Sequence, residues 1–193
     1  MMVGQEAGAI LAGAALGEGS AFAWIAYRTK ARGYELGWLG WGKQTTATGI
    51  AAGLLVAALY CGGSVASQPG AAGELLRVGP LKLLAVVAAG AAALFEETFF
   101  RGLLMNRLRA SGRGPAVQVV ISGVAFGMAH GLWGLMAPQQ TLGFIAFTTV
   151  LGLALAGVFL LGLRSLTPVI LSHFVIDAVL EPWLLLHALP AWH

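Results

Sequence analysis

Long apolar runs dominate the chain, and short polar or glycine- and proline-containing stretches separate them. The apolar residues are continuous and do not alternate with a period of two, which favours helices over barrel strands. A helix needs about 20 residues to cross the hydrocarbon core of a bilayer. Segments of that length lie at about residues 7–27, 46–66, 80–104, 115–136, 141–162 and 167–187. The pattern predicts an all-α, polytopic helical membrane protein with about six transmembrane helices around a central intramembrane cavity.

Composition strengthens this prediction and limits the classes of protein to consider. Hydrophobic residues make up 58% of the 193 residues and charged residues only 10%, whereas soluble domains carry about 25% charged residues. We expect a single membrane domain over residues 1–193, with two N-terminal spans in 1–79 and the polar motifs in a core at 80–187. The single cysteine, Cys61, excludes an intrachain disulfide and a multi-cysteine metal site.

The basic residues predict an orientation in the membrane. The first, third and fifth predicted loops contain eight of the 11 Lys and Arg residues, and the opposite side contains only Arg77 and Lys82. The positive-inside rule places those three loops in the cytoplasm and both termini outside. The glycine- and alanine-rich composition favours a prokaryotic inner or plasma membrane. The net charge of +3 suits contact with the lipid bilayer, and we expect no nucleic acid partner.

Ionisable residues inside the predicted spans are functional candidates, because charges in a bilayer are costly. The sequence FEETFFRGLL (95–104) contains adjacent glutamates, Glu96 and Glu97, which diverge by about 100° on a helix. Arg101 follows Glu97 by four residues, the spacing of a same-face ion pair. Glu96 is then an unpaired carboxylate suited to proton transfer near neutrality. The alternative is that Glu96 is a second arm of the same salt bridge.

Two further spans carry histidines. His130 follows Phe126 by one helical turn in FGMAHG (126–131), and His173 and Asp177 are four residues apart in LSHFVIDAVLEP (171–182). Taken singly, each could be a polar contact between helices. At a rise of 1.5 Å per residue, all three groups lie roughly 10–20 Å from the same predicted cytoplasmic side. We therefore expect them to meet in one cavity that opens to that side.

Such a cluster is suited to hydrolysis without a covalent intermediate. A carboxylate and a histidine can hold and deprotonate a water molecule, and a second histidine with a polar neighbour can stabilise the resulting oxyanion. A nucleophilic side chain is not indicated. Cys61 has no nearby histidine in sequence, and Ser122 and Ser172 lack a nucleophile-elbow context.

These motifs resemble those of the CAAX prenyl protease and bacteriocin-processing family, also called Abi or CPBP. EETFFR is similar to the motif EExxxR, FGMAH to FxxxH, and HFVID to HxxxN or HxxxD, in the same order. The likeness covers about residues 80–187. It implies an intramembrane endopeptidase that hydrolyses a membrane-anchored or membrane-associated peptide or protein. The substrate class, whether a prenylated tail, a bacteriocin or pheromone leader or a sorting tail, is not specified by these residues.

The resemblance also implies roles for single residues. Glu96 corresponds to the general base and His130 to a residue that holds the water, while Glu97, Arg101 and Phe126 support the site. His173 and Asp177 correspond to the oxyanion-stabilising pair. The last motif position is often Asn in the family, and an ionised Asp177 would repel an oxyanion. Asp177 would therefore either be protonated and donate a hydrogen bond or orient His173.

Other readings of the same residues stay open. Glu96, His130 and His173 could supply a ligand set for zinc or another divalent cation, although no HExxH helix is present and we favour a metal-free glutamate mechanism. The main rival function is a non-catalytic immunity or chaperone-like membrane protein on the same scaffold. A transporter would predict internal repeats, which the sequence does not show. Glu18, in the first span, is expected to have a packing or interface role.

Overall fold

The computed structural model describes residues 2–67, 79–131 and 141–188, with side chains described for 8–67, 79–131 and 141–180. Its α-helices are α1 (Met2–Ala31), α2 (Ala47–Ser67), α4 (Pro80–Glu97), α5 (Met105–Ala110), α6 (Pro115–His130), α7 (Thr141–Leu161) and α8 (Thr167–Ala188). A short 3₁₀ helix, η1 (Leu36–Trp38), follows α1, and a π-helix, η2 (Thr98–Leu104), joins α4 to α5. The described part of the chain contains no strand, so the predicted all-α fold is confirmed.

The helices follow the predicted spans closely. Four are long and apolar enough to cross a membrane: α1, α2, the continuous rod Pro80–Ala110 and α7. α6 and the part of α8 up to Leu180 are shorter apolar helices, and residues 132–136 of the predicted fourth span lie outside the described residues. These helices confirm the predicted polytopic membrane architecture.

One predicted boundary was wrong, because the third span continues past residue 104 to Ala110. The Asn106 side chain extends the helix there: its amide nitrogen donates to the carbonyl oxygens of Gly102 and Trp38, each at 2.7 Å. Arg107 and Arg109 are good helix formers whose long side chains reach water from the end of a helix. Basic residues near the membrane surface therefore did not mark the helix end.

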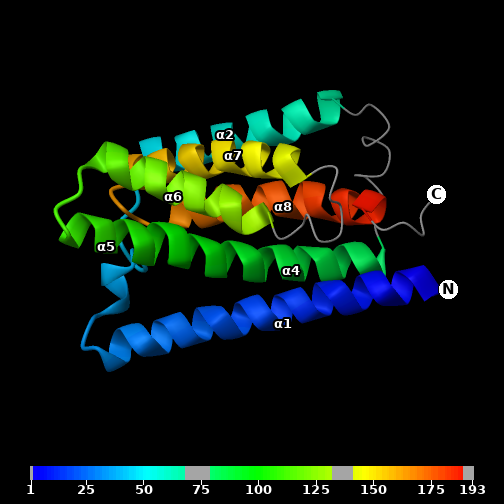
Figure 1. Ribbon diagram of the computed structural model, residues 1–193, viewed down its shortest axis with the longest axis horizontal. Helices are drawn as coiled ribbons and strands as arrows, with labels where there is room; N and C mark the ends of the chain where they lie inside the picture. Colours follow the sequence, from blue (N-terminus) through cyan, green and yellow to red (C-terminus); the bar gives the residue numbers. More distant parts are fainter. Residues whose placement is uncertain (1, 68–78, 132–140, 189–193) are drawn as a thin grey trace.

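α4 and α8 lie at the centre of the bundle (Figure 1). α1 packs along α4 on one side, and α2 and α7 pack with α8 on the other, while α6 packs mainly against α7. α1 and α4 run in the same direction, and α6 and α7 run antiparallel to each other. The end of α4 thus lies beside both α6 and α8, which is the arrangement that the predicted cavity requires.

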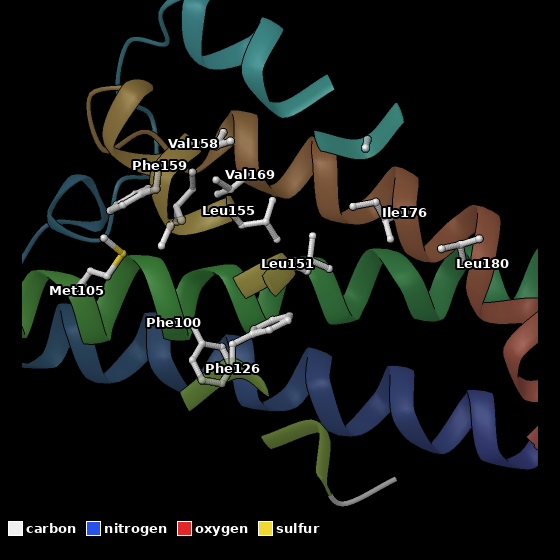
Figure 2. Packing of buried hydrophobic residues seen from close by; sticks show 13 residues of the cluster. Phe100, Met105, Phe126, Leu151, Leu155, Val158, Phe159, Val169, Ile176 and Leu180 are labelled. Carbon is white, nitrogen blue, oxygen red and sulfur yellow. The ribbon is translucent and has the colours of Figure 1, made fainter. Parts of the chain in front are cut away.

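A cluster of buried apolar side chains fills the space between η2, α6, α7 and α8 (Figure 2). Phe100 and Phe126 pack edge to face with ring centroids 5.3 Å apart. The outward faces are also apolar, since Leu16, Leu59 and Val150 are each more than 60% exposed. A helix that is apolar on all sides is typical of a membrane span, so these faces fit contact with lipid.

Glycines bring α6 and α7 into close contact. A Cβ atom added at Gly152 would lie 2.8 Å from the carbonyl oxygen of Gly123, and one added at Gly127 would lie 2.8 Å from that of Ile145. Gly123 and Gly127 form a GxxxG pair, the spacing that lets two membrane helices approach closely. The neighbours here are backbone atoms, which cannot move aside without shifting the helix.

A polar network joins the connections at one end of the bundle. The Arg164 guanidinium, in the turn between α7 and α8, donates to Asn106 Oδ1 at 3.1 Å and to Gln118 Oε1 at 2.5 Å. Gln118 in turn donates from its amide nitrogen to the Arg113 carbonyl oxygen at 2.6 Å. These bonds fix the α7–α8 turn relative to α5 and α6, the elements that lead into the polar cluster.

We predict that Gly127→Ala lowers the free energy of unfolding by about 1–3 kcal/mol, the usual cost of overpacking a close contact. The new methyl group would overlap Thr149 Oγ1 and the Ile145 carbonyl oxygen. Gly143→Ala is the matched control, because a Cβ atom at Gly143 in the neighbouring helix has no other atom within 4 Å. Thermal unfolding of the purified protein in detergent measures both. An equal loss in the two variants would contradict the proposed close contact.

Candidate active site

The site lies where the end of α4 meets α6 and α8. Glu96 and Glu97 are the last two residues of α4, and the wider turns of η2 begin directly after them. In η2 the Met105 amide donates to the Phe100 carbonyl oxygen, five residues back, and Ser122 of α6 donates its hydroxyl hydrogen to the same oxygen at 3.2 Å. Ser122 thus has a structural partner. π-turns inside α-helices often occur at functional sites, and this one had no signal in the sequence.

Glu97 is the buried centre of an ion-pair network. Its side chain is fully buried, and its Oε1 accepts from Arg101 Nη1 at 2.8 Å and from His173 Nδ1 at 2.8 Å. Arg101, also fully buried, donates from Nη2 to the Gly152 carbonyl oxygen at 3.0 Å. The ion pair expected between Glu97 and Arg101 is present. The contact with His173 was not expected, because the two residues are 76 positions apart.

His173 is held on both sides of its ring by carboxyl groups. Nδ1 faces the ion-paired Glu97 carboxylate, and Nε2 lies 3.1 Å from Asp177 Oδ2 one helical turn later in α8. Since Glu97 accepts, Nδ1 carries the hydrogen of that bond. The imidazole is 97% buried, whereas the Asp177 side chain is 23% exposed. The orientation of His173 is therefore fixed, and its Nε2 faces the more open part of the site.

Glu96 forms no hydrogen bond with another described residue but lies next to both histidines. Its Oε2 is 3.9 Å from His130 Nε2 and 4.0 Å from His173 Nε2, and this atom has no hydrogen-bond partner. These distances are too long for direct hydrogen bonds but fit a water molecule between the groups. Within the described residues Arg101 forms its ion pair with Glu97 and not with Glu96. The geometry therefore does not support Glu96 as a second arm of that salt bridge.

His130 has a tautomer that its surroundings fix. Its Nδ1 lies 2.9 Å from the Phe126 carbonyl oxygen, which can only accept a hydrogen bond. Nδ1 therefore carries a hydrogen, and Nε2 of the neutral ring has a free lone pair. This Nε2 atom lies 3.9 Å from Glu96 Oε2, and the His130 side chain is 19% exposed. A water molecule beside Nε2 would donate a hydrogen bond to it.

Phe126 forms the apolar wall of the site. The ring is fully buried, and its centroid lies 4.6 Å from that of His130 and 5.6 Å from that of His173. The Arg101 guanidinium carbon lies 4.5 Å from the same ring, within the range of a cation–π contact. One side chain thus contacts both imidazoles and the buried cation, and it limits the space in which the polar groups can move.

Glu18 of α1 borders the site, although the sequence suggested only a packing or interface role. α1 packs parallel to α4, with Leu11 against Ala85 and Ala88, so Glu18 lies near the level of the end of α4. Its Oε2 is buried without a hydrogen-bond partner, and the carboxyl group interacts electrostatically with Glu96. A glutamate within an apolar span was the available signal, but sequence distance concealed its proximity.

Glu96, His130 and His173 were also the expected metal-ligand set. Among residues 8–67, 79–131 and 141–180, no group of three or more His, Cys, Asp or Glu side chains is placed to hold a metal ion. In the expected set, His173 Nε2 lies 3.1 Å from Asp177 Oδ2 and 4.0 Å from Glu96 Oε2. Glu96 Oε2 and His130 Nε2 can also form hydrogen bonds to a water molecule.

The family comparison agrees with this geometry. A model of the Rce1-like family, described as type II CAAX prenyl endopeptidase, matches residues 78–179, which is 102 of the 193 residues. The match includes the site residues from Glu96 to Asp177 and leaves out α1 and α2. No curated protein and no solved structure gives a significant match. The chain therefore belongs to the Rce1-like family of type II CAAX prenyl endopeptidases, a family of intramembrane proteases.

Proposed function

We propose that the protein hydrolyses a peptide bond in a membrane-anchored or membrane-associated peptide or protein by a metal-free glutamate mechanism. One observation carries the proposal: Glu96 Oε2 lies within 4.0 Å of the Nε2 atoms of His130 and His173, which belong to two other helices. Membership of a protease family supports the peptidase activity. The residue roles follow from the hydrogen-bonding capacity of each group.

Glu96 and His130 bind and activate the attacking water. Both present acceptors, the unpartnered Glu96 Oε2 and the lone pair on His130 Nε2. A water molecule that donates one hydrogen to each acceptor keeps its oxygen lone pairs free to attack the substrate carbonyl carbon. As the new C–O bond forms, Glu96 takes a proton from the water.

His173 and Asp177 stabilise the oxyanion that forms on the substrate carbonyl oxygen. With Nδ1 donating to Glu97, a second ring proton on Nε2 is available as a donor toward the open side of the site. Asp177 orients this group, or donates its own hydrogen when protonated. The intermediate then collapses with cleavage of the C–N bond, and the proton held by Glu96 passes to the leaving amine.

Glu97 and Arg101 act through His173 as positioning residues. Neither is exposed to solvent, and the described structure places no substrate-accessible surface on them. The Glu97 carboxylate fixes the Nδ1 hydrogen of His173, and Arg101 neutralises that carboxylate. This arrangement presents Nε2 to the substrate while Nδ1 stays occupied.

We place the protein in a prokaryotic inner or plasma membrane with the cavity open toward the cytoplasm. The polar network around Arg164 and the basic end of α5 lie at the same end of the bundle, and the positive-inside rule assigns that end to the cytoplasm. A substrate anchored in the bilayer could then reach Glu96 and His130, whose side chains are 17% and 19% exposed.

We predict that Glu96→Gln lowers the cleavage rate about 10²- to 10⁴-fold, the usual contribution of a general acid–base group. Glutamine keeps the size of the side chain and removes its basicity. The measurement is cleavage of a tagged membrane-anchored peptide by the protein in nanodiscs. Glu35→Gln, at an exposed position in the loop after α1, is the control. Full cleavage by both Glu96→Gln and His173→Ala would disprove the mechanism. If Glu96→Gln kept its full biological function without cleaving the peptide, a non-catalytic protein would be favoured.

Treatment with a metal chelator followed by dialysis is expected to leave the cleavage rate unchanged. The reason is that, in the proposed mechanism, Glu96 and His130 activate the water molecule without a metal ion, and His173 Nε2 carries a hydrogen that stabilises the oxyanion. The rate is measured before treatment, after treatment and after addition of zinc. Loss of activity on chelation and its recovery with zinc would overturn the metal-free step while leaving the peptidase assignment intact.

We predict that Arg101→Met lowers the free energy of unfolding by about 3–5 kcal/mol, because it leaves the buried Glu97 charge without its cation. The double variant Glu97→Met/Arg101→Met should recover most of this loss, since an apolar pair needs no compensation. Cleavage should stay low in the double variant, because His173 Nδ1 has lost its acceptor. Thermal unfolding and the cleavage assay separate the two effects. Recovery of cleavage together with stability would show that the ion pair has only a structural role.

A further inference from the structure

A small pocket lies at the C-terminal end of α1, away from the candidate active site. Its walls come from the last turns of α1, from η1 and from the junction of η2 and α5, and its volume is about 100 Å³. Figure 1 shows these elements at the end of the bundle that also carries the α7–α8 turn. Arg107 at the pocket is 11 residues from Glu96, which is roughly 16 Å along a helix. The two sites are therefore separate.

Three arginines line this pocket: Arg28, Arg32 and Arg107. None forms an ion pair with a carboxylate of the described residues, and no acidic side chain is among the lining residues. A concave surface that carries charge of one sign attracts a ligand of the opposite sign. The pocket thus offers guanidinium groups, which suit the oxygens of a phosphate group.

Two of the three guanidinium groups are held against aromatic walls. The Arg28 guanidinium carbon lies 5.6 Å from the centre of the Trp24 ring, and that of Arg107 lies 5.6 Å from the centre of the Trp38 ring. Trp24 and Trp38 also line the pocket. Tryptophan at the end of a transmembrane helix is typical of the headgroup region of a bilayer. The aromatic rings therefore hold the Arg28 and Arg107 guanidinium groups at the pocket, at the level of the headgroup region of the bilayer.

A threonine hydroxyl adds a neutral hydrogen-bonding group. Thr29 lines the pocket, and its hydroxyl can donate one hydrogen bond. A phosphate oxygen held by the arginines is a suitable acceptor for it.

The size of the pocket restricts the ligand further. Sites for drug-sized molecules have volumes of about 300–1,000 Å³, so a volume of about 100 Å³ suits a phosphate-sized group. The neighbouring surface of α1 is apolar, with Trp24 and Tyr27 each more than 60% exposed. A ligand with a phosphate head and apolar chains would place its head in the pocket and its chains along this surface.

We propose that the pocket formed by Arg28, Thr29, Arg32 and Arg107 binds the phosphate of an anionic phospholipid from the cytoplasmic leaflet. This binding site goes beyond the proposed peptidase function, and two of its three arginines lie on α1 and its following turn, outside the family match at residues 78–179. The bound lipid would join the end of α1 to η2 and α5, and so stabilise the contact between α1 and the rod that carries Glu96.

The test compares two double variants of the full chain in a neutral detergent. Arg28→Gln/Arg107→Gln removes two charges from the pocket, and Arg109→Gln/Arg113→Gln removes two exposed charges from the same end of the bundle. Titration with phosphatidylglycerol, followed by native mass spectrometry and thermal unfolding, should show binding weakened roughly 10- to 30-fold in the pocket variant, since each arginine near an anionic lipid contributes about 1 kcal/mol. The control variant should lose less than about threefold, because Arg109 and Arg113 do not line the pocket and salt screens their attraction to a lipid bound there.

Phosphatidylcholine and inorganic phosphate distinguish the possible sources of the phosphate. Phosphatidylcholine is expected to stabilise the wild type less than phosphatidylglycerol, and Thr29→Val should weaken only the phosphatidylglycerol effect. Equal weakening in the two double variants, or no preference for phosphatidylglycerol, would overturn the site. Inorganic phosphate could also stabilise the wild type as much as phosphatidylglycerol does and fail to stabilise the pocket variant. That result would overturn the assignment of the ligand to a lipid.

Discussion

The structure depends on one constraint, the need to neutralise the Glu97 carboxylate inside a bundle that has almost no water-facing interior. A buried charge in a membrane protein is stable only with close partners. Glu97 has two, Arg101 and His173, at 2.8 Å each, and Arg101 continues the network to the Gly152 carbonyl oxygen. Three elements, the α4–η2 junction, α7 and α8, are thereby held at fixed distances. The same bonds that satisfy the charge also orient the imidazole of the candidate site.

Helix packing makes this neutralisation possible. Arg101 donates to the Gly152 carbonyl oxygen, and Gly152 also lies in close contact with Gly123 of α6. The glycines of α6 and α7 let the two helices approach closely. They thereby hold α6, with Phe126 and His130, against the helix whose backbone accepts from the buried cation. The close packing of small residues and the placement of the charged residues therefore depend on the same helix contacts.

The sequence predicted the features that depend on local patterns. Continuous apolar runs predicted the helical spans, and the four-residue spacing predicted the ion pair between Glu97 and Arg101. Features that depend on how the helices pack against one another were missed. They are the bond from His173 to Glu97, the π-helical turn η2 and the position of Glu18 beside the site. Hydropathy and spacing indicated the depth at which the polar residues of different spans lie, but not which of these residues form direct bonds. The end of the third span was also missed, because arginines near the surface are compatible with helix.

We propose that the two adjacent glutamates provide one structural and one reactive carboxyl group from the same helix. They diverge by about 100°, so Glu97 faces α8 and the buried cation while Glu96 faces the space between His130 and His173. Glu97 Oε1 accepts from Arg101 Nη1 and His173 Nδ1, although Glu97 Oε2 has no partner among the described residues. Glu96 Oε2 has no such partner either, but it lies within 4.0 Å of the Nε2 atoms of two oriented imidazoles, a spacing that fits a water molecule between the groups. This position beside both imidazoles is the physical reason for our proposal that Glu96 performs the chemistry and Glu97 supports it.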